Sequence, residues 1–203
     1  MTFMGLWFIS RASGLALLVV FTLTMVLGVA ARTGSAPRRW PRLAVAELHR
    51  TLALFGVAFL VLHVITAIID PFVTIGWLAT VLPLASPYRT AAIGLGALAV
   101  DLGAAVLITS LLRQRLGYRA WRAVHWLAYL AWPVAFLHSL TAGADLGIWW
   151  VAGIEWGCAA AVGTAVLARL LHVLRPPRPV RRPPAGAHPP RPRIGAARQA
   201  RLS

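Results

Sequence analysis

Long apolar stretches alternate with short arginine-containing segments along most of the chain. A membrane-spanning helix needs about 20 apolar residues, because each residue rises about 1.5 Å and the hydrocarbon core is about 30 Å thick. Residues 71–87 are also apolar, but Gly76 and Pro83 interrupt them, which favours an interfacial or re-entrant segment over a span. Five stretches meet the length, and we predict a spanning helix at each: residues 12–31, 44–69, 90–112, 120–140 and 148–174.

Composition also indicates a membrane protein. Of the 203 residues, 59% are hydrophobic, and the mean hydropathy of +0.74 exceeds what a soluble domain of this size needs. We predict an all-α integral membrane protein with a five-helix transmembrane bundle in residues 1–174, or six helices if residues 71–87 also cross. Residues 175–203 are mainly Pro, Arg and Ala, which predicts a disordered cytoplasmic tail that contacts anionic lipid. The apolar N-terminal run continues into a full span, which favours a first helix over a cleavable signal.

Arginine accounts for every basic side chain and predicts the orientation. The formal net charge is +15, but the charge lies between and after apolar segments, so we exclude a nucleic-acid binder. Arginines concentrate at residues 32–50, at residues 113–122 and in the tail, whereas the opposite connections hold only Asp70, Arg89 and Asp145. With five spans, the positive-inside rule predicts a multi-pass protein of the cell membrane with its N-terminus outside and its C-terminus in the cytoplasm.

Four of the six histidines lie inside two predicted spans. His49 and His63 belong to the second span, and His125 and His138 to the fourth. A lone histidine in a membrane helix is as easily explained by an interhelical hydrogen bond as by a functional role, but four in matched pairs favour ligands. The members of a pair are 14 or 13 residues apart, about 20 Å along a helix, so they cannot share one small metal ion.

Each membrane level receives one histidine from each of the two helices. In the five-span topology both helices run from inside to outside, so His49 is level with His125 near the cytoplasm, and His63 is level with His138 near the outer face. Zinc or copper would need further ligands, and we expect no Cys, Asp or Glu beside either pair that would complete a tetrahedral set. Two imidazoles suffice for six-coordinate haem. The single cysteine, Cys158, and the lack of a Cys-x-x-Cys-His run leave non-covalent, b-type haem as the predicted cofactor.

One spacing does not fit a regular helix. At about 100° per residue, 14 residues return to within about 40° of the same face, but 13 residues miss it by about 140°. Pro133 lies between His125 and His138, and we predict a kink or bulge there. The alternative is that Pro133 is an ordinary membrane-helix proline.

The residues around the four histidines carry a family resemblance. The second span contains LHR at His49 and LHV at His63, and the fourth contains WRAVHW around His125 and LH at His138. Over residues 5–170 the chain resembles the ferric reductase-like transmembrane family. That family includes NADPH oxidases, ferric reductases and the haem-bearing membrane subunit of the bacterial periplasmic methionine sulfoxide reductase system.

The resemblance implies two b haems that carry electrons across the membrane, with His49 and His125 as inner and His63 and His138 as outer iron ligands. Many relatives continue into flavin and nicotinamide domains, whereas only 29 residues follow Leu174 here. The run from Gly94 to Gly96 is a poor dinucleotide fingerprint, because it lies in a predicted span. We therefore expect a separate donor, either a flavoprotein reductase or a membrane quinol, and an extracytoplasmic acceptor such as ferric iron, oxygen or a redox protein. Whether the chain is itself an enzyme or an oxidoreductase's electron-transfer component stays open.

Arginines are candidates for the haem propionates, because they pair with carboxylates in two-point geometry. Arg11 and Arg89 are the only arginines predicted on the outer side, so they are candidates at the outer haem. Arg50 and Arg122 neighbour the inner ligands, but for them a role in orienting the protein is at least as well supported.

Several further residues have two interpretations. Asp101 and Glu155 lie within spans, where a proton or quinol role competes with an interhelical hydrogen bond. Glycines permit close approach of helices or of a macrocycle, and the Gly153 to Gly157 spacing weakly suggests a homo-oligomer. Helix packing is favoured over a haem-lining role for the aromatic residues. The glycines are Gly14, Gly56, Gly153 and Gly157, and the aromatics are Phe55, Phe59, Trp126, Trp132 and Phe136.

A different class of function also fits an apolar helical chain. A haem-free transporter or assembly subunit would use the same bundle without needing iron ligands. We assign neither His172 nor His188 to haem, because they lie at the cytoplasmic end of the last span and in the tail.

Overall fold

The computed structural model describes residues 2–33, 41–73, 75–143 and 147–174, and all its regular elements are helical. Candidate spans by length and hydropathy are α1, α2, α3 and α6, and the bent pair α4 and α5 makes a fifth if it crosses as one unit. The elements are α1 (Thr2–Thr33), α2 (Arg42–Ile69), η1 (Trp77–Thr80), α3 (Thr90–Leu111), α4 (Arg113–His125), α5 (Ala128–Ala142) and α6 (Trp149–Leu174).

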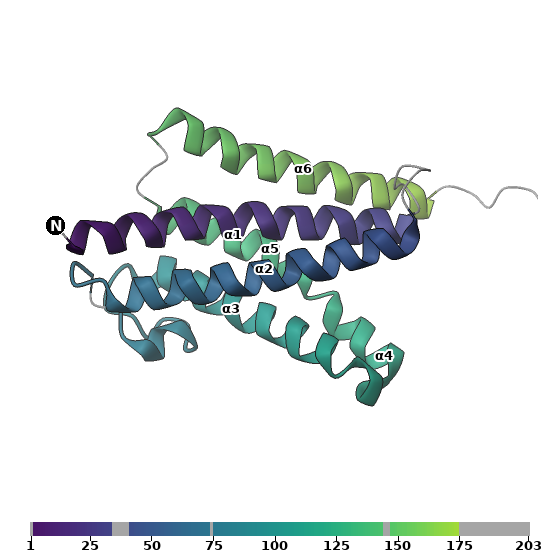
Figure 1. The fold of residues 1–203 in the computed structure, drawn as a ribbon, viewed down its shortest axis with the longest axis horizontal. Helices are drawn as coiled ribbons and strands as arrows, with labels where there is room; N and C mark the ends of the chain where they lie inside the picture. The colour runs from purple at the N-terminus through teal and green to yellow at the C-terminus, as the bar shows by residue number, and fades with distance from the viewer. Residues whose placement is uncertain (1, 34–40, 74, 144–146, 175–203) are drawn as a thin grey trace, which may run out of the picture. The chain divides into compact units, whose positions relative to one another are not determined.

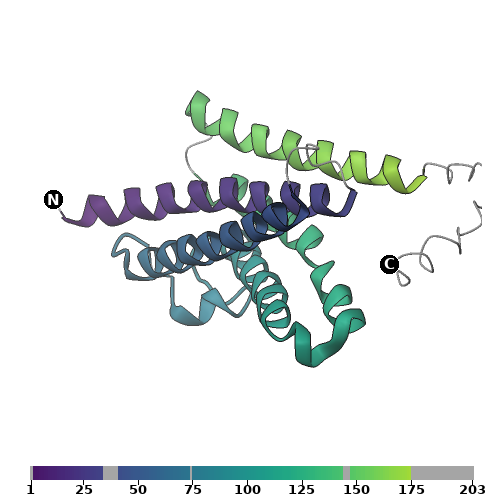
Figure 2. The same ribbon diagram turned by 45° about the vertical axis from the view of Figure 1, so that its right-hand side comes forward.

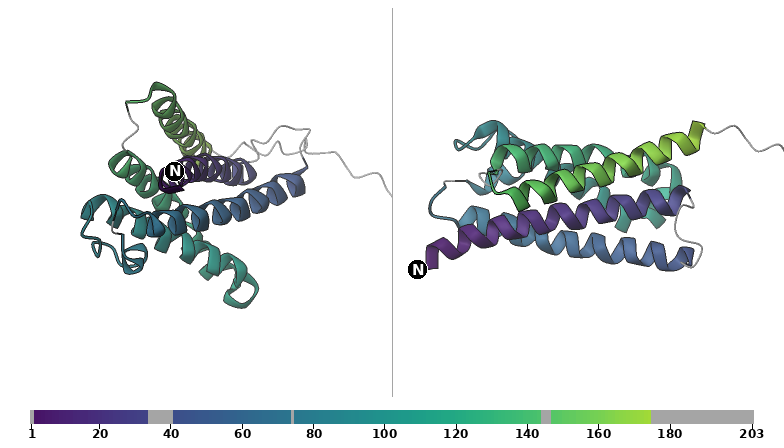
Figure 3. Two further views of the ribbon diagram at one scale, coloured as in Figure 1. Left: turned by 60° about the vertical axis from the view of Figure 1, so that its left-hand side comes forward. Right: turned by 90° about the horizontal axis from the view of Figure 1, so that it is seen from above.

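Helices α1 and α2 form an antiparallel pair that packs along most of its length (Figure 1). The two further views in Figure 3 show the same pairing. Helix α2 ends at Ile69 because Pro71 disfavours helical geometry at the residue before it. The Asp70 carboxylate then accepts a hydrogen bond of 2.9 Å from the Phe72 N–H, which turns the chain out of the helix.

The connection from α3 into the fourth predicted span is a tight turn. Gly117 interrupts α4 with φ 76° and ψ 160°, a region that only glycine enters without strain. The residues of α4 after this turn lead back toward α5, so α4 and α5 together run antiparallel to α3 (Figure 1).

The predicted span at residues 120–140 is not one regular helix, because α4 stops at His125 and α5 starts at Ala128 with a bend of 45°. Hydrogen bonds of the i to i−3 type replace the regular ladder here: Leu127 to Val124, Tyr129 to Trp126, and Leu130 to Leu127. The predicted irregularity between His125 and His138 therefore exists, but it precedes Pro133, which lies inside α5. Proline removes the N–H that would bond the carbonyl four residues earlier, at Tyr129, so it weakens the first turn of α5, directly after the break.

Helix α6 packs on the side of α1 that is opposite α2 (Figures 1 and 2). The contact is a small apolar core of Leu18 and Met25 from α1, Trp132 and Phe136 from α5, and Cys158 and Val162 from α6. In the described part of residues 71–87 the one helix is the short η1, which packs against α3, and none of these residues belongs to a candidate span. The predicted tail, residues 175–203, lies outside the described residues, as does Asp145.

Candidate functional site: two stacked histidine pairs

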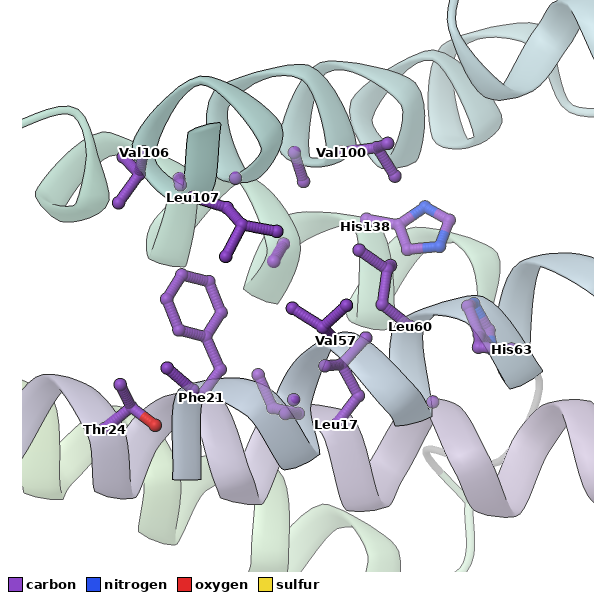
Figure 4. Close-up of a pocket in the computed structure, with 18 of the residues that line it drawn as sticks. Leu17, Phe21, Thr24, Val57, Leu60, His63, Val100, Val106, Leu107 and His138 are labelled. Atoms are coloured by element: carbon purple, nitrogen blue, oxygen red, sulfur yellow. The ribbon is translucent and has the colours of Figure 1, made fainter. Parts of the chain in front are cut away.

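A cavity of about 1770 Å³ runs between the α1–α2 pair and helices α3 to α5, and all four predicted ligand histidines line it. Figure 4 shows its middle, where Leu17, Val57 and Leu60 face Val100 and Leu107. Pockets for one small ligand measure about 300–1,000 Å³, so this cavity is larger than a single such ligand requires. Its walls between the two ends are apolar.

The histidines meet in two pairs across this cavity. The ring centroids of His49 and His125 are 6.4 Å apart, with an interplanar angle of 61°. Those of His63 and His138 are 6.3 Å apart, with an angle of 77°. These are the pairs expected from helix direction and depth.

Backbone carbonyls hold three of the four imidazoles through Nδ1. The Nδ1 of His49 is 2.9 Å from the Thr24 oxygen, and that of His63 is 2.8 Å from the Ser10 oxygen, both on α1. The Nδ1 of His138 is 2.7 Å from the Ala92 oxygen on α3. A carbonyl can only accept, so in these three rings Nδ1 carries the hydrogen and Nε2 is left as a lone-pair donor for a metal.

Glycines let the same three imidazoles lie against the neighbouring helices. A Cβ added at Gly14 would be 2.9 Å from Cε1 of His63, and one at Gly96 would be 2.7 Å from Cε1 of His138. At Gly28 the distance to Cε1 of His49 would be 3.3 Å. Gly14 was among the predicted close-approach glycines, whereas Gly28 and Gly96 were missed. A signal for Gly28 was available in the sequence: Gly14 and Gly28 are 14 residues apart, the same spacing as His49 and His63.

His125 differs from the other three. Its Nδ1 is buried and has no hydrogen-bond partner. The Trp121 ring lies 5.0 Å from the His125 ring at an interplanar angle of 32°, so an aromatic contact supports this imidazole instead.

The two predicted outer arginines converge on the end of α5 that follows His138. Arg89 donates from Nη1 to the carbonyls of Thr141, at 3.2 Å, and Ala142, at 3.3 Å. Arg11 donates to the Ala142 carbonyl at 3.4 Å and lies over the Trp7 ring. Both line the cavity and place positive charge at the negative end of the α5 dipole.

At the opposite end of the cavity, Arg50 and Arg122 are exposed and line its rim. Arg32 joins them, because its Nη1 donates to the Tyr118 hydroxyl at 3.3 Å and Arg122 lies over the same Tyr118 ring. From the sequence, Arg32 served only to predict the orientation in the membrane. Its contact with Tyr118 could not be predicted, because the two residues are 86 positions apart.

The two intramembrane carboxylates have different surroundings. Glu155 is buried, lines the cavity and accepts a hydrogen bond from the hydroxyl of Ser139, the residue after His138. Its other carboxylate oxygen, Oε2, is buried without a partner. Asp101 is half-buried on α3 and does not line the cavity.

Most of the aromatic residues named from the sequence pack elsewhere. Trp132 and Phe136 stack in the core beneath α6, as the packing interpretation predicted, and Phe55 is 56% exposed on α2. Of the named aromatics only Trp126 lines the cavity. Phe21, which the sequence did not single out, points into the cavity from α1 (Figure 4).

Among the described residues, no group of three or more His, Cys, Asp or Glu side chains could hold a metal ion. The paired imidazoles therefore fit a cofactor whose metal needs only two protein ligands. With metal–nitrogen bonds of about 2.0 Å, two imidazoles on opposite faces of one metal have ring centroids about 6 Å apart. Both observed pairs have this separation.

The apolar helices indicate a multi-pass membrane protein, and two stacked histidine pairs line its cavity. The family model described as ferric reductase-like transmembrane component matches residues 13–136, more than half of the chain, and the chain belongs to this family. The match contains His49, His63 and His125 and ends two residues before His138. No curated protein and no solved structure matches the chain. Membrane domains of this family generally bind haem, and membership indicates a role in electron transfer across a membrane.

Proposed function

We propose that the protein is a di-haem b-type cytochrome that carries electrons across the cell membrane. Electrons would pass from a cytoplasmic or quinol donor to an extracytoplasmic acceptor. The observation that carries the proposal is the pair of bis-imidazole sites, with ring centroids 6.4 and 6.3 Å apart, at two levels of one cavity. We infer His49 and His125 as the inner ligands, and His63 and His138 as the outer ligands.

Haem b would supply a one-electron Fe(III)/Fe(II) couple at each level. The carbonyls of Ser10, Thr24 and Ala92 fix the tautomer of three histidines and raise the basicity of the ligating nitrogen. Aliphatic side chains line the cavity between the two levels (Figure 4). The Phe21 side chain lies in this apolar stretch and provides polarisable atoms between the two sites (Figure 4).

Arginines at the two ends of the cavity provide the positive charge that propionate groups need. Arg11 and Arg89 would serve the outer haem, and Arg50 and Arg122, together with Arg32, the inner haem. Arg11 and Arg89 already bind carbonyls at the end of α5, so their guanidinium groups are held near the outer level.

The first test is a dithionite-reduced minus oxidised difference spectrum of the purified protein, with haem quantified per chain. We expect a bis-histidine b-type spectrum and about two haems, one for each pair of axial ligands. A single haem would contradict the two-level assignment. A protein without haem would overturn the proposal and favour the transporter or assembly function.

Histidine substitutions assign the two levels. We expect His63→Ala to lose the outer haem and His49→Ala the inner one, so that each variant keeps about one haem per chain, because bis-histidine ligation requires both partners of a pair. His172→Ala is the matched control, since His172 is exposed at the end of α6 and does not line the cavity. Retention of both haems in His63→Ala would contradict the ligand assignment.

A further inference from the structure

Three of the four histidines contact a neighbouring helix through one repeated arrangement. A backbone carbonyl at position i accepts from the imidazole, and a glycine at position i+4 gives the ring room to reach it. The three copies are Ser10 with Gly14, Thr24 with Gly28, and Ala92 with Gly96. The two copies on α1 are 14 residues apart.

The fourth copy on α3 is altered. Counting 14 residues on from Ala92 and Gly96 leads to Val106 and Ser110, and both line the same cavity as His125. The Ser110 hydroxyl donates to the Val106 carbonyl at 2.6 Å, and the Thr109 hydroxyl lies 3.2 Å from the same oxygen. Serine therefore replaces the glycine of the other three copies. A Cβ at Gly14 or Gly96 would be 2.9 or 2.7 Å from the imidazole, so the Cβ of Ser110 takes the room that a ring would need to reach the Val106 carbonyl.

Trp121 connects this serine to the histidine. Its Nε1–H donates to the Ser110 hydroxyl oxygen at 3.2 Å, and its ring lies 5.0 Å from that of His125. Because Ser110 accepts from Trp121, its own hydrogen is directed to Val106. The Nδ1 of His125 is correspondingly the one imidazole Nδ1 among the four that is buried without a partner.

We propose that Ser110, held by Trp121, is a positioning residue that makes His125 a weaker ligand than the other three histidines and gives the inner haem the more positive reduction potential. The inference rests on the proposed function. An imidazole whose Nδ1–H is hydrogen-bonded donates more electron density to iron and stabilises the ferric state, and second-shell hydrogen bonds are one of the levers on haem potential. His125 lacks that bond, so ferrous iron is favoured at its level.

The test is an equilibrium redox titration of the full-length protein carrying Ser110→Gly. This change restores the glycine of the other three copies, so that the His125 imidazole gains the room to reach the Val106 carbonyl. We expect the ferric-to-ferrous ratio of the inner haem at a fixed ambient potential to rise about tenfold, a shift of about 59 mV for a one-electron couple. The outer haem should not shift. An unchanged inner haem would overturn the inference.

Two further variants keep the outcome interpretable. Ser110→Ala removes the hydroxyl but keeps the Cβ, so we expect the inner haem to keep its potential; a shift equal to that in Ser110→Gly would overturn the inference. Thr164→Ala is the matched control, because Thr164 on α6 makes the same type of bond, at 2.7 Å to the Ala160 carbonyl, away from the cavity. A shift in Thr164→Ala equal to that in Ser110→Gly would overturn the inference.

Trp121→Phe separates the aromatic contact from the hydrogen bond. It keeps a ring against His125 but cannot donate to Ser110, so we expect a smaller shift in the same direction as Ser110→Gly. No shift would remove Trp121 from the proposal. Failure of the proposed function is distinguishable, because it would appear as absent haem in the unsubstituted protein rather than as an unshifted potential.

Discussion

At the scale of single residues, contact distance decides which glycines matter. Gly14 and Gly96 lie so close to an imidazole that a Cβ would be 2.9 or 2.7 Å from a ring carbon, closer than real Cβ atoms approach. Gly103, on the same helix as Gly96, also lines the cavity but has nothing within 4 Å of a built Cβ. The same substitution should therefore have opposite consequences at two positions of α3.

We expect Gly96→Ala to displace His138 and weaken haem binding at the outer level about 10- to 100-fold, the usual effect of disturbing the support of a metal ligand. Haem content per chain and the amplitude of the reduced-minus-oxidised spectrum measure this. Gly103→Ala is the control and should keep both haems. Equal haem content in the two variants would show that His138 does not need the space at Gly96.

At the scale of elements, the break between α4 and α5 solves the spacing problem of His125 and His138. A turn with i to i−3 hydrogen bonds advances about 120° per residue instead of about 100°, which rotates the later residues in the direction that a 13-residue spacing needs. The chain places this turn at Trp126 to Leu130, within the two turns before Pro133. A regular helix over residues 120–140 would leave one histidine facing away from the cavity.

The turn at Gly117 is the second element-scale feature with a measurable consequence. Because φ 76° and ψ 160° are essentially restricted to glycine, we expect Gly117→Ala to destabilise the fold by about 1–3 kcal/mol. The measurement is the midpoint of thermal unfolding in detergent, followed by haem absorbance. Gly163→Ala, in the interior of α6 with nothing within 4 Å, should leave the midpoint unchanged or raise it. Equal midpoints for the two variants would argue against strain at Gly117.

At the scale of the whole molecule, direction of electron flow depends on which end of the bundle faces the cytoplasm. The arginine distribution predicts that the α3–α4 turn is cytoplasmic and that the segment around η1 is outside. Leu82, in the segment around η1, and Gln114, in the α3–α4 turn, are both exposed, so labels at these two positions can report the orientation.

Single cysteines test this topology in a Cys158→Ala background, since Cys158 is the only native cysteine and is buried. We expect a membrane-impermeant maleimide added to intact cells to label Leu82→Cys but to label Gln114→Cys only after permeabilisation. The reverse pattern would invert the proposed direction of electron transfer. Labelling both positions from outside would contradict a single orientation.

Much of this protein was predictable from its sequence because a bilayer constrains local patterns strongly. Backbone groups in hydrocarbon must bond within their own segment, so apolar length alone indicates α1, α2, α3 and α6. Helix direction and the similar spacings of 14 and 13 residues then paired His49 with His125 and His63 with His138 before any coordinates. These conclusions depend on periodicity and length, which a sequence displays directly.

Only the tertiary structure decided the features that depend on contacts between helices. The sequence did not reveal that Gly28 and Gly96 face imidazoles, that the fourth span breaks at Trp126 and Leu127, or that Phe21 points into the cavity. Nor did it reveal that the Ser110 hydroxyl donates to the Val106 carbonyl and accepts from Trp121, the ring beside His125. The physical reason is that rotation of a helix about its axis is set by the side chains it meets on its neighbours, and that information is distributed over residues far apart in the chain.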